Sequence, residues 1–314
     1  MKKLKDNTSL GKLILVCNVV VLLLFIISMV LLMKFDKTNN AVIQDRHHYE
    51  NLYESYVTAQ HPMRQDSAEV AYYQYKLDTL QQKTAATKDE KKALSESIEV
   101  TKQTLADKKK QQEEHMAALT KLEAEYAPAK EEWDNLNQAN DAAKKTFWVM
   151  AFLTIAAFLA KTFVFAQWGA KNNQNLHNIA PWMKSGMKPW MSYVAWFVPI
   201  YNLFKPLSFF KEVWEETDYS LENAGVVARD ENKVDNSSLY MAIWWGLLLI
   251  SVWLMNFILY STFFREGAFF VKTNHGSMVV VAIVIMVLCM LLESYLVLQY
   301  NKKNKMLLDN ESKF

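Results

Sequence analysis

The chain has 314 residues, of which 51% are hydrophobic and 22% are charged, and its mean hydropathy is close to zero. This average hides two kinds of sequence, because four apolar runs of about 20 residues or more alternate with charged stretches. Runs of that length cross roughly 30 Å of hydrocarbon, so a soluble globular protein is excluded. The 35 basic and 33 acidic residues leave a formal charge of +2, which argues against nucleic acid as a partner.

The apolar runs predict membrane-spanning helices at residues 13–33, 147–166, 239–264 and 278–298. The lysines before the first run resemble the start of a signal peptide, but the apolar core is too long and no small-residue cleavage site follows, so we expect an anchor. Lysines lie next to the first and last runs, including Lys12, Lys302 and Lys303. The positive-inside rule therefore predicts that both termini are cytoplasmic.

The hydrophilic stretch at residues 34–145 is expected to form a helical hairpin outside the cytoplasm. No glycine occurs from Lys12 to Trp168, which favours helix throughout. The flanking spans enter and leave the same face, so the chain has to turn back, and a capping box of Thr87 and Glu90 predicts a turn near residues 84–88.

A second capping box, Asp66 with Glu69, predicts another helix start just after Pro62. Pro62 and Pro128 are the two prolines of the stretch and are expected to bend it.

An apolar stripe at heptad spacing predicts that the hairpin arms form a coiled coil. Its residues are Val70, Tyr73, Leu77, Leu80, Leu94, Ile98 and Leu105. The stripe weakens at Lys109, Gln112 and Glu123, which leaves open whether the arms pair with each other or with another copy. A solvated helical spacer without a partner is the competing interpretation.

Residues 189–216 are too short an apolar stretch between prolines for a further span and predict a broken helix in the membrane interface. The segment resembles domain-of-unknown-function family 4328, an uncharacterised family of bacterial multi-pass membrane domains, over roughly residues 146–300. The motif residues are Trp196, Phe197, Pro199, Asn202, Leu203, Pro206, Glu212 and Trp214. The resemblance implies a multi-pass architecture and a bacterial inner membrane location, and it implies no activity or cofactor.

Polar residues inside the predicted spans are the sharpest candidates for a site. Lys161 and Glu293 each lie about five residues from the cytoplasmic end of a span, and Asn18 reaches the same level. An ionised side chain in lipid costs several kcal/mol, so we expect Lys161 and Glu293 to pair inside the bundle. The alternative is that each is solvated separately at the membrane surface.

Enzyme chemistry has little support in this sequence. The six histidines are scattered or directly adjacent, which is not metal-ligand spacing, and the two cysteines are too few for a disulfide framework. There is no phosphate-binding glycine loop and no nucleophile elbow, so no cofactor and no catalytic residue are expected. The acidic residues 215–235 are expected to form a mobile loop.

The sequence therefore predicts an all-α membrane protein with a segment and first span at 1–33, a coiled-coil hairpin at 34–145, a membrane domain at 146–300 and a cytoplasmic tail at 301–314. We expect a non-enzymatic scaffold or sensor component that forms a homo-oligomer or binds an envelope protein through the hairpin. The alternative is a channel or transporter with a polar site at Lys161, Glu293 and Asn18.

Overall fold

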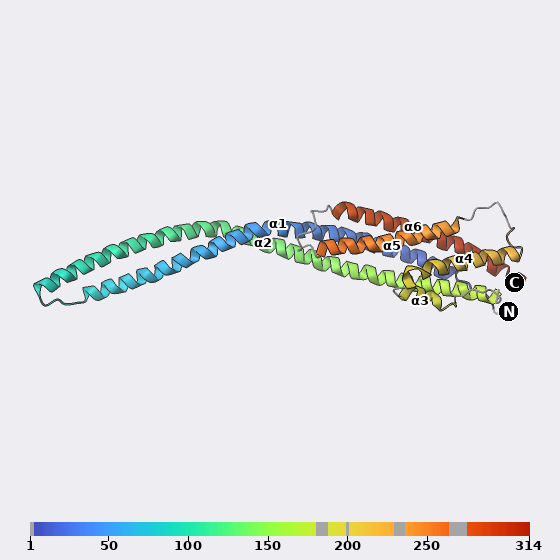
Figure 1. The fold of residues 1–314 in the computed structure, drawn as a ribbon, viewed down its shortest axis with the longest axis horizontal. Coiled ribbons are helices and arrows are strands. Elements are labelled where there is room, and N and C mark those ends of the chain that lie inside the picture. Colours follow the sequence, from blue (N-terminus) through green and yellow to red (C-terminus); the bar gives the residue numbers. More distant parts are fainter. Residues whose placement is uncertain (1–2, 180–187, 199–200, 229–235, 264–274) are drawn as a thin grey trace. The chain divides into compact units, whose positions relative to one another are not determined.

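The computed structural model describes residues 3–179, 188–198, 201–228, 236–263 and 275–314, and none of these lies in a β-strand. The predicted all-α fold class is confirmed (Figure 1). The helices are, in chain order, α1 (Thr8–Gln81), α2 (Lys88–Ile179), α3 (Met191–Phe197), η1 (Tyr201–Leu203), α4 (Lys205–Asn223), α5 (Ser237–Phe263), α6 (His275–Asp309) and η2 (Glu311–Lys313).

Four of these helices, α1, α2, α5 and α6, are long and apolar enough to cross a membrane, which agrees with the four predicted spans. The end of the third predicted span, Phe264, lies outside the described residues. The chain divides into two compact units. The hairpin unit is Lys37–Ala142, and the membrane unit is Met1–Asp36 with Ala143–Phe314. Helices α1 and α2 contribute to both units.

The membrane unit is apolar outside as well as inside. Its outward-facing side chains include Val16, Leu23, Val30, Phe152, Ile155, Leu159, Trp253, Val280 and Leu291, all of which are exposed. Helices with apolar residues on every side are typical of a bundle surrounded by lipid, because a water-facing surface would carry polar residues there. The chain is therefore a multi-pass membrane protein.

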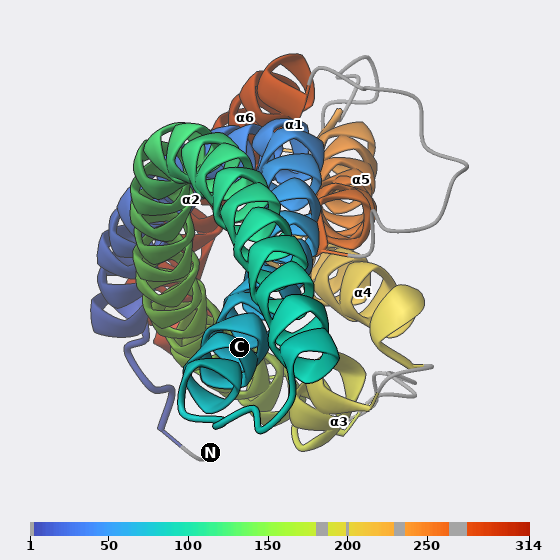
Figure 2. The same cartoon turned by 90° about the vertical axis from the view of Figure 1, so that its left-hand side faces the viewer.

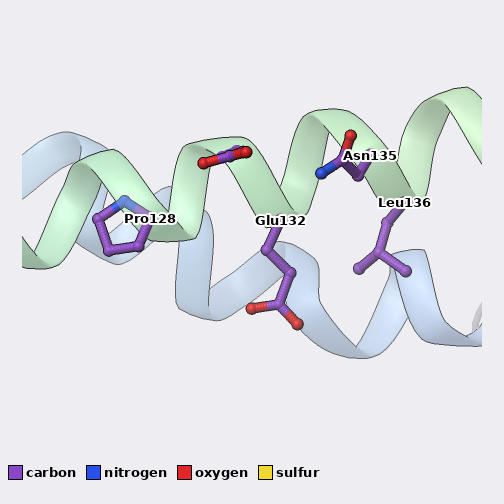
Figure 3. Close-up of a pocket in the computed structure, with 5 residues that line it drawn as sticks. Pro128, Glu132, Asn135 and Leu136 are labelled. Carbon is purple, nitrogen blue, oxygen red and sulfur yellow. The ribbon is translucent and has the colours of Figure 1, made fainter.

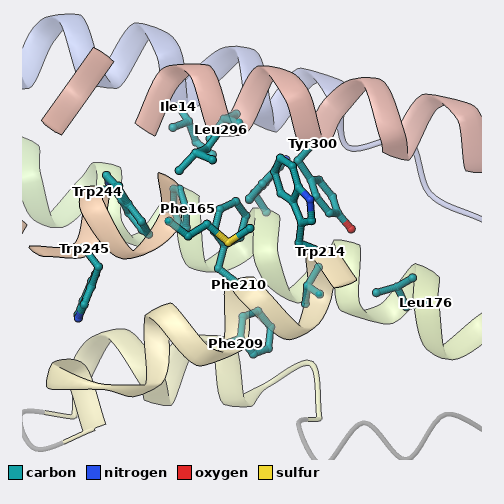
Figure 4. Packing of buried hydrophobic residues seen from close by; sticks show 14 of the residues in the cluster. Ile14, Phe165, Leu176, Phe209, Phe210, Trp214, Trp244, Trp245, Leu296 and Tyr300 are labelled. Carbon is teal, nitrogen blue, oxygen red and sulfur yellow. The ribbon is translucent and has the colours of Figure 1, made fainter. Parts of the chain in front are cut away.

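Two apolar clusters fill the interior of the membrane unit. The first cluster is mostly aliphatic, and α1, α2, α5 and α6 each contribute to it through residues such as Phe25, Phe147, Ile258 and Met286. The second cluster is rich in aromatic rings from α2, α4, α5 and α6 (Figure 4). Its central rings are Phe165, Trp168, Phe210, Trp214, Trp244 and Tyr300, with neighbouring centroids 5.2 to 6.3 Å apart.

The predicted broken helix is present as α3, η1 and α4. Pro206 lies in the first turn of α4, where its missing N–H leaves no helical bond unmade. The apolar side of α4 is buried by residues such as Phe209, Phe210 and Val213, which pack into the aromatic cluster. The apolar side of α4 is thus covered by the other helices of the unit.

Helix continues into the stretch predicted as a mobile loop and into the predicted cytoplasmic tail. Helix α4 continues to Asn223, so the acidic stretch predicted as a loop from Glu215 is helical in its first part, while residues 229–235 lie outside the description. Helix α6 continues to Asp309, so most of the predicted tail extends the last span. A contact between Asp218 and Lys303 joins these two extensions, and Lys303 also lies 4.4 Å from the ring centroid of Trp214.

The hairpin unit consists of the second part of α1 and the first part of α2, which run antiparallel side by side (Figures 1 and 2). Side-chain contacts give the register, since they move up one arm as they move down the other. They join Thr38 to Asn140, Tyr49 to Trp133, Tyr56 to Tyr126, Asp66 to His115, and Glu69 to Lys108.

The apolar stripe predicted from heptad spacing faces inward in the hairpin unit. Leu77 and Leu105 are buried, and the other five stripe residues are half-buried. Thr101, which continues the stripe, is 5% exposed. Pairing of the two arms of one chain therefore accounts for the stripe in this structure.

One of the two predicted capping boxes is correct. Helix α2 begins at Lys88, the Glu90 carboxylate accepts hydrogen bonds from the backbone N–H groups of Thr87 and Ala86, and the Glu90 N–H donates to the Thr87 hydroxyl. The helix start predicted at Asp66 is wrong, because α1 continues through Pro62 and that region without a break.

Candidate intramembrane polar centre

An ion pair between α2 and α6 lies inside the membrane unit. Lys161 Nζ is 2.8 Å from Glu293 Oε2, and the two residues are 4% and 2% exposed. The pairing expected from their matching depths is therefore present, and separate solvation at the membrane surface does not describe these side chains. Because both charges are removed from water, each depends on the other for compensation.

The other groups around Lys161 are soft and apolar. Its ammonium lies 3.6 Å from Met290 Sδ and 5.4 Å from the ring centroid of Phe158. A cation is attracted to the face of an aromatic ring, and more strongly where water is absent. The site is thus a buried ion pair with largely apolar neighbours.

Glu293 also links α5 to the pair. The indole N–H of Trp244, which is fully buried, donates to Glu293 Oε2 at 3.1 Å. The same ring stacks at 5.7 Å from Phe165, one helical turn along α2 from Lys161. The carboxylate therefore joins α2, α5 and α6 at one point.

Asn18 brings α1 to the same level of α6. Its side-chain amide donates to the hydroxyl of Ser294 at 3.0 Å, and Ser294 directly follows Glu293 in the chain. We call Asn18, Lys161, Trp244, Glu293 and Ser294 the polar centre. Each of the four apolar helices contributes at least one of these residues.

The polar centre has unused hydrogen-bonding capacity. Within the part of the chain that the structure describes, Glu293 Oε1 and Asn18 Oδ1 are buried and have no hydrogen-bond partner. A buried acceptor without a donor costs about 1–3 kcal/mol, so these atoms are either a cost of the arrangement or sites for a further group.

The sequence pattern did not reveal Trp244 and Ser294 as partners in this network. It also missed a set of buried asparagines, one just before α1 and the others where α2 and α6 extend past the apolar runs. These are Asn7, Asn172, Asn173, Asn175, Asn301 and Asn304. Asn175 pairs with both the N–H and the carbonyl of Lys5, and Asn7 donates to Asn172, so the N-terminal segment is fixed to α2. The feature of the sequence that could have indicated these residues is the three-residue spacing of Asn172 and Asn175, and of Asn301 and Asn304, within helices.

The residues of the family motif divide into buried and exposed members. Trp196 contacts Phe165, Trp244 and Trp245, and Trp214 is buried beside Tyr300. The Leu203 carbonyl accepts a bond from the Trp245 indole at 3.0 Å, although its side chain, like that of Phe197, is exposed.

The remaining motif residues have local roles. Asn202 donates its backbone N–H to Val198, Pro206 is buried, and Glu212 is half-buried on α4. Pro199 lies outside the described residues. The motif thus seats the broken helix against α2 and α5, next to the polar centre.

Comparison with known protein families gives a match for the C-terminal part of the chain. A model of the domain of unknown function DUF4328 matches residues 134–302, which include Lys161, Trp244 and Glu293 and leave out Asn18 and most of the hairpin unit. Neither the curated proteins nor the solved structures contain a match to this chain. Since the matched region is more than half of the 314 residues, the chain belongs to the DUF4328 family.

Proposed function

We propose that this protein is a non-enzymatic scaffold or sensor component of a bacterial inner membrane. In this proposal it acts through its hairpin unit, which lies outside the cytoplasm. The observation that carries the proposal is the hairpin unit itself, a separate compact body whose two arms contact each other along their length. Such a body presents a long preformed helical surface to a partner or to another copy, with little ordering cost on binding.

The character of the polar centre supports this role over transport. Its charges neutralise each other at 2.8 Å in an apolar setting, and one carboxylate joins three helices. Interhelical polar contacts of this kind hold bundles together in lipid, where no hydrophobic force acts between helices. The centre therefore acts as a clamp that holds the membrane unit while the hairpin unit makes the functional contacts.

Shortening the hairpin tests the proposal. Removing two heptads from each arm, residues 64–77 and 105–118, deletes segments that oppose each other in the observed register and keeps the capped turn at Thr87. We expect the shortened protein to insert into the membrane and to lose its complex on native gels of mild-detergent extracts. An unchanged complex would refute the role of the hairpin unit.

Labelling in sealed cells tests the proposed orientation. In a background without Cys17 and Cys289, single cysteines at Thr84 and Ser312 are both exposed positions. A membrane-impermeant maleimide should modify the cysteine at position 84 and leave that at 312 unmodified until the cells are opened. The reverse pattern would place the hairpin unit in the cytoplasm.

A channel or transporter is the second candidate, favoured by the unpartnered acceptors Glu293 Oε1 and Asn18 Oδ1. A buried polar acceptor without a hydrogen-bond donor inside a membrane is the kind of group that ion and proton paths use. Ion flux into reconstituted vesicles that falls in Glu293→Gln and persists in Asn256→Ala would establish this role. Asn256 is a suitable control because its amide bonds only locally, to the Val252 carbonyl.

A further inference from the structure

The hairpin unit carries a group of aromatic side chains that both arms share. Tyr49 stacks on Trp133 at 5.0 Å between centroids, Tyr56 stacks on Tyr126 at 4.7 Å, and Tyr53 lies 6.1 Å from Tyr126. Nearer the turn the inner face includes the buried aliphatic residues Leu77 and Leu105 and the buried polar residues Asp66 and Thr101. The aromatic group therefore gives this part of the hairpin unit a different surface chemistry.

This aromatic group borders an open groove on α2. A hollow of about 390 Å³ is lined by Tyr56, Glu123, Tyr126, Lys130, Glu131 and Asp134, among others. A second hollow of about 420 Å³ shares Glu131 and Asn135 with the first and extends past Pro128 to Glu132 and Leu136 (Figure 3). We call the two hollows together the tyrosine groove.

Negative charge dominates around the tyrosine groove. Residues 37–63 and 111–142 carry 11 Asp and Glu against 4 Lys and Arg, whereas residues 64–110 carry 8 against 10. The hairpin unit is fully described, and in it Glu123, Glu131 and Asp134 take part in no ion pair. A hydrogen bond with Tyr126 and burial, and to a smaller extent the charge of Asp134, raise the pKa of Tyr49 to about 12.

We propose that the tyrosine groove docks a cationic, arginine-bearing segment of a partner polypeptide. A guanidinium stacks flat on an aromatic face and at the same time donates paired hydrogen bonds to a carboxylate. The groove offers both kinds of group together, since Tyr56, Tyr126, Glu131 and Asp134 line the same hollow. The inference rests on the proposed function, since it names the partner chemistry of the hairpin unit.

The same charges argue against other occupants. Nucleic acids and anionic lipid headgroups are repelled by a surface with this excess of carboxylates. A second copy placed symmetrically on the same face would bring its own carboxylates against these, and like-charge repulsion opposes that arrangement. Charge complementarity thus favours a basic partner.

Peptide binding to the full-length protein in nanodiscs of zwitterionic lipid tests the proposal. The probes are a labelled peptide of alternating arginine and glycine and the same peptide with lysine or with glutamate, measured by fluorescence anisotropy against empty nanodiscs. We expect the arginine peptide to bind, the lysine peptide to bind several-fold more weakly and the glutamate peptide not to bind. Absence of arginine-peptide binding would overturn the inference.

Two variants separate the groove from general electrostatics. Glu131→Gln with Asp134→Asn should weaken the arginine peptide about tenfold, and Tyr126→Leu should do so while keeping apolar volume in the stack. The matched control is Glu96→Gln with Glu99→Gln, two exposed residues without ion pairs in the other half of the unit. Equal weakening by the control pair would show diffuse attraction and refute a defined site. Circular dichroism of each variant monitors helix content.

The stability of the native complex in each variant distinguishes failure of the proposed scaffold function from failure of the groove inference. If shortening the hairpin abolishes the complex and the Glu131/Asp134 variant also weakens it, both proposals are supported. If shortening abolishes the complex and the groove variant leaves it intact, the scaffold function stands and the groove inference falls. A groove variant that changes the mass of the purified oligomer, without changing peptide binding, would assign the groove to a second copy and overturn the cationic partner.

Discussion

Replacing Lys161 by methionine keeps an unbranched side chain, one heavy atom shorter, and leaves Glu293 without its cation. Glu293 is 2% exposed, so its ionised carboxylate would retain the Trp244 N–H as its described donor. Breaking a buried ion pair by removing one partner costs about 3–5 kcal/mol. Glu293→Gln should cost a similar amount, since it leaves the Lys161 ammonium buried beside a neutral amide. Both single variants should therefore unfold well before the parent protein.

The double variant Lys161→Met with Glu293→Gln should recover most of that loss. The glutamine keeps an acceptor for the Trp244 N–H, and the two substitutions together remove both charges. We therefore expect a free energy of unfolding within about 1 kcal/mol of the parent. Titration with SDS in mixed micelles measures it through tryptophan fluorescence, because nine of the ten tryptophans lie outside the hairpin unit. A double variant that loses as much stability as the two single variants added together would show that the charges act independently and would refute the clamp.

Three further predictions concern single positions. Gly11→Ala should cost about 1–3 kcal/mol, because a Cβ there would fall inside the Asn301 amide; the same titration measures it. Leu77→Ala should cost about 2–5 kcal/mol of hairpin stability, measured by thermal melting of helix content, since Leu77 is 8% exposed. Hydrogen bonds from Thr87 hold the pKa of Glu90 below its ordinary 4.5, so its capping contribution is complete above 4.5 and is lost as pH falls through the lowered value; the protection of the amides at residues 88–91, measured against their intrinsic exchange rates at each pH, should then decrease.

Each of these three changes has a control in the same chain. Gly246→Ala meets no atom within 4 Å and should be neutral or slightly stabilising. Val100→Ala alters a residue that is 63% exposed on the same unit and should have little effect on melting. Glu96→Gln removes an exposed carboxylate that caps no helix. At each pH the protection of residues 88–91 in this variant should equal that in the parent protein. A control that changes as much as its partner would contradict the stated cause.

The helices could be predicted because length, hydropathy and the absence of glycine are properties of the chain alone. The two capping boxes show the limit of such reasoning. Asp66 and Glu69 have the same spacing as Thr87 and Glu90, but in the folded hairpin they pair with His115 and Lys108 on the other arm. Contacts between the arms keep α1 helical through Pro62, whose lost hydrogen bond is a local cost that packing offsets.

The candidate site shows a related limit. Depth along a span can be counted from the sequence, and it correctly brought Lys161 and Glu293 together. The rotation of each helix about its own axis cannot be counted in the same way, because these helices are apolar on every side and have no amphipathic face to orient them. Trp244 and Ser294 were therefore not identifiable as partners.

The buried polar side chains past the apolar runs could not be predicted for a different reason. Composition records that Asn172, Asn301 and Lys303 are polar, and polar segments after a span usually lie in solvent. Here the polar groups find partners on neighbouring segments, as in the bonds from Asn7 to Asn172 and from Trp168 to Asn301. Burial of such groups becomes acceptable once hydrogen bonds replace water, and that depends on the tertiary structure.

The two units are stabilised by different forces, and this makes their roles separable by experiment. Burial of Leu77 and Leu105 in water stabilises the hairpin arms through the hydrophobic effect, which denaturants that solvate apolar groups weaken. Between helices in lipid that effect is absent, so the membrane unit depends on close packing and on interhelical polar contacts such as the Lys161–Glu293 pair. Variants of the polar centre should therefore change resistance to SDS, and variants of the hairpin core should change melting in urea.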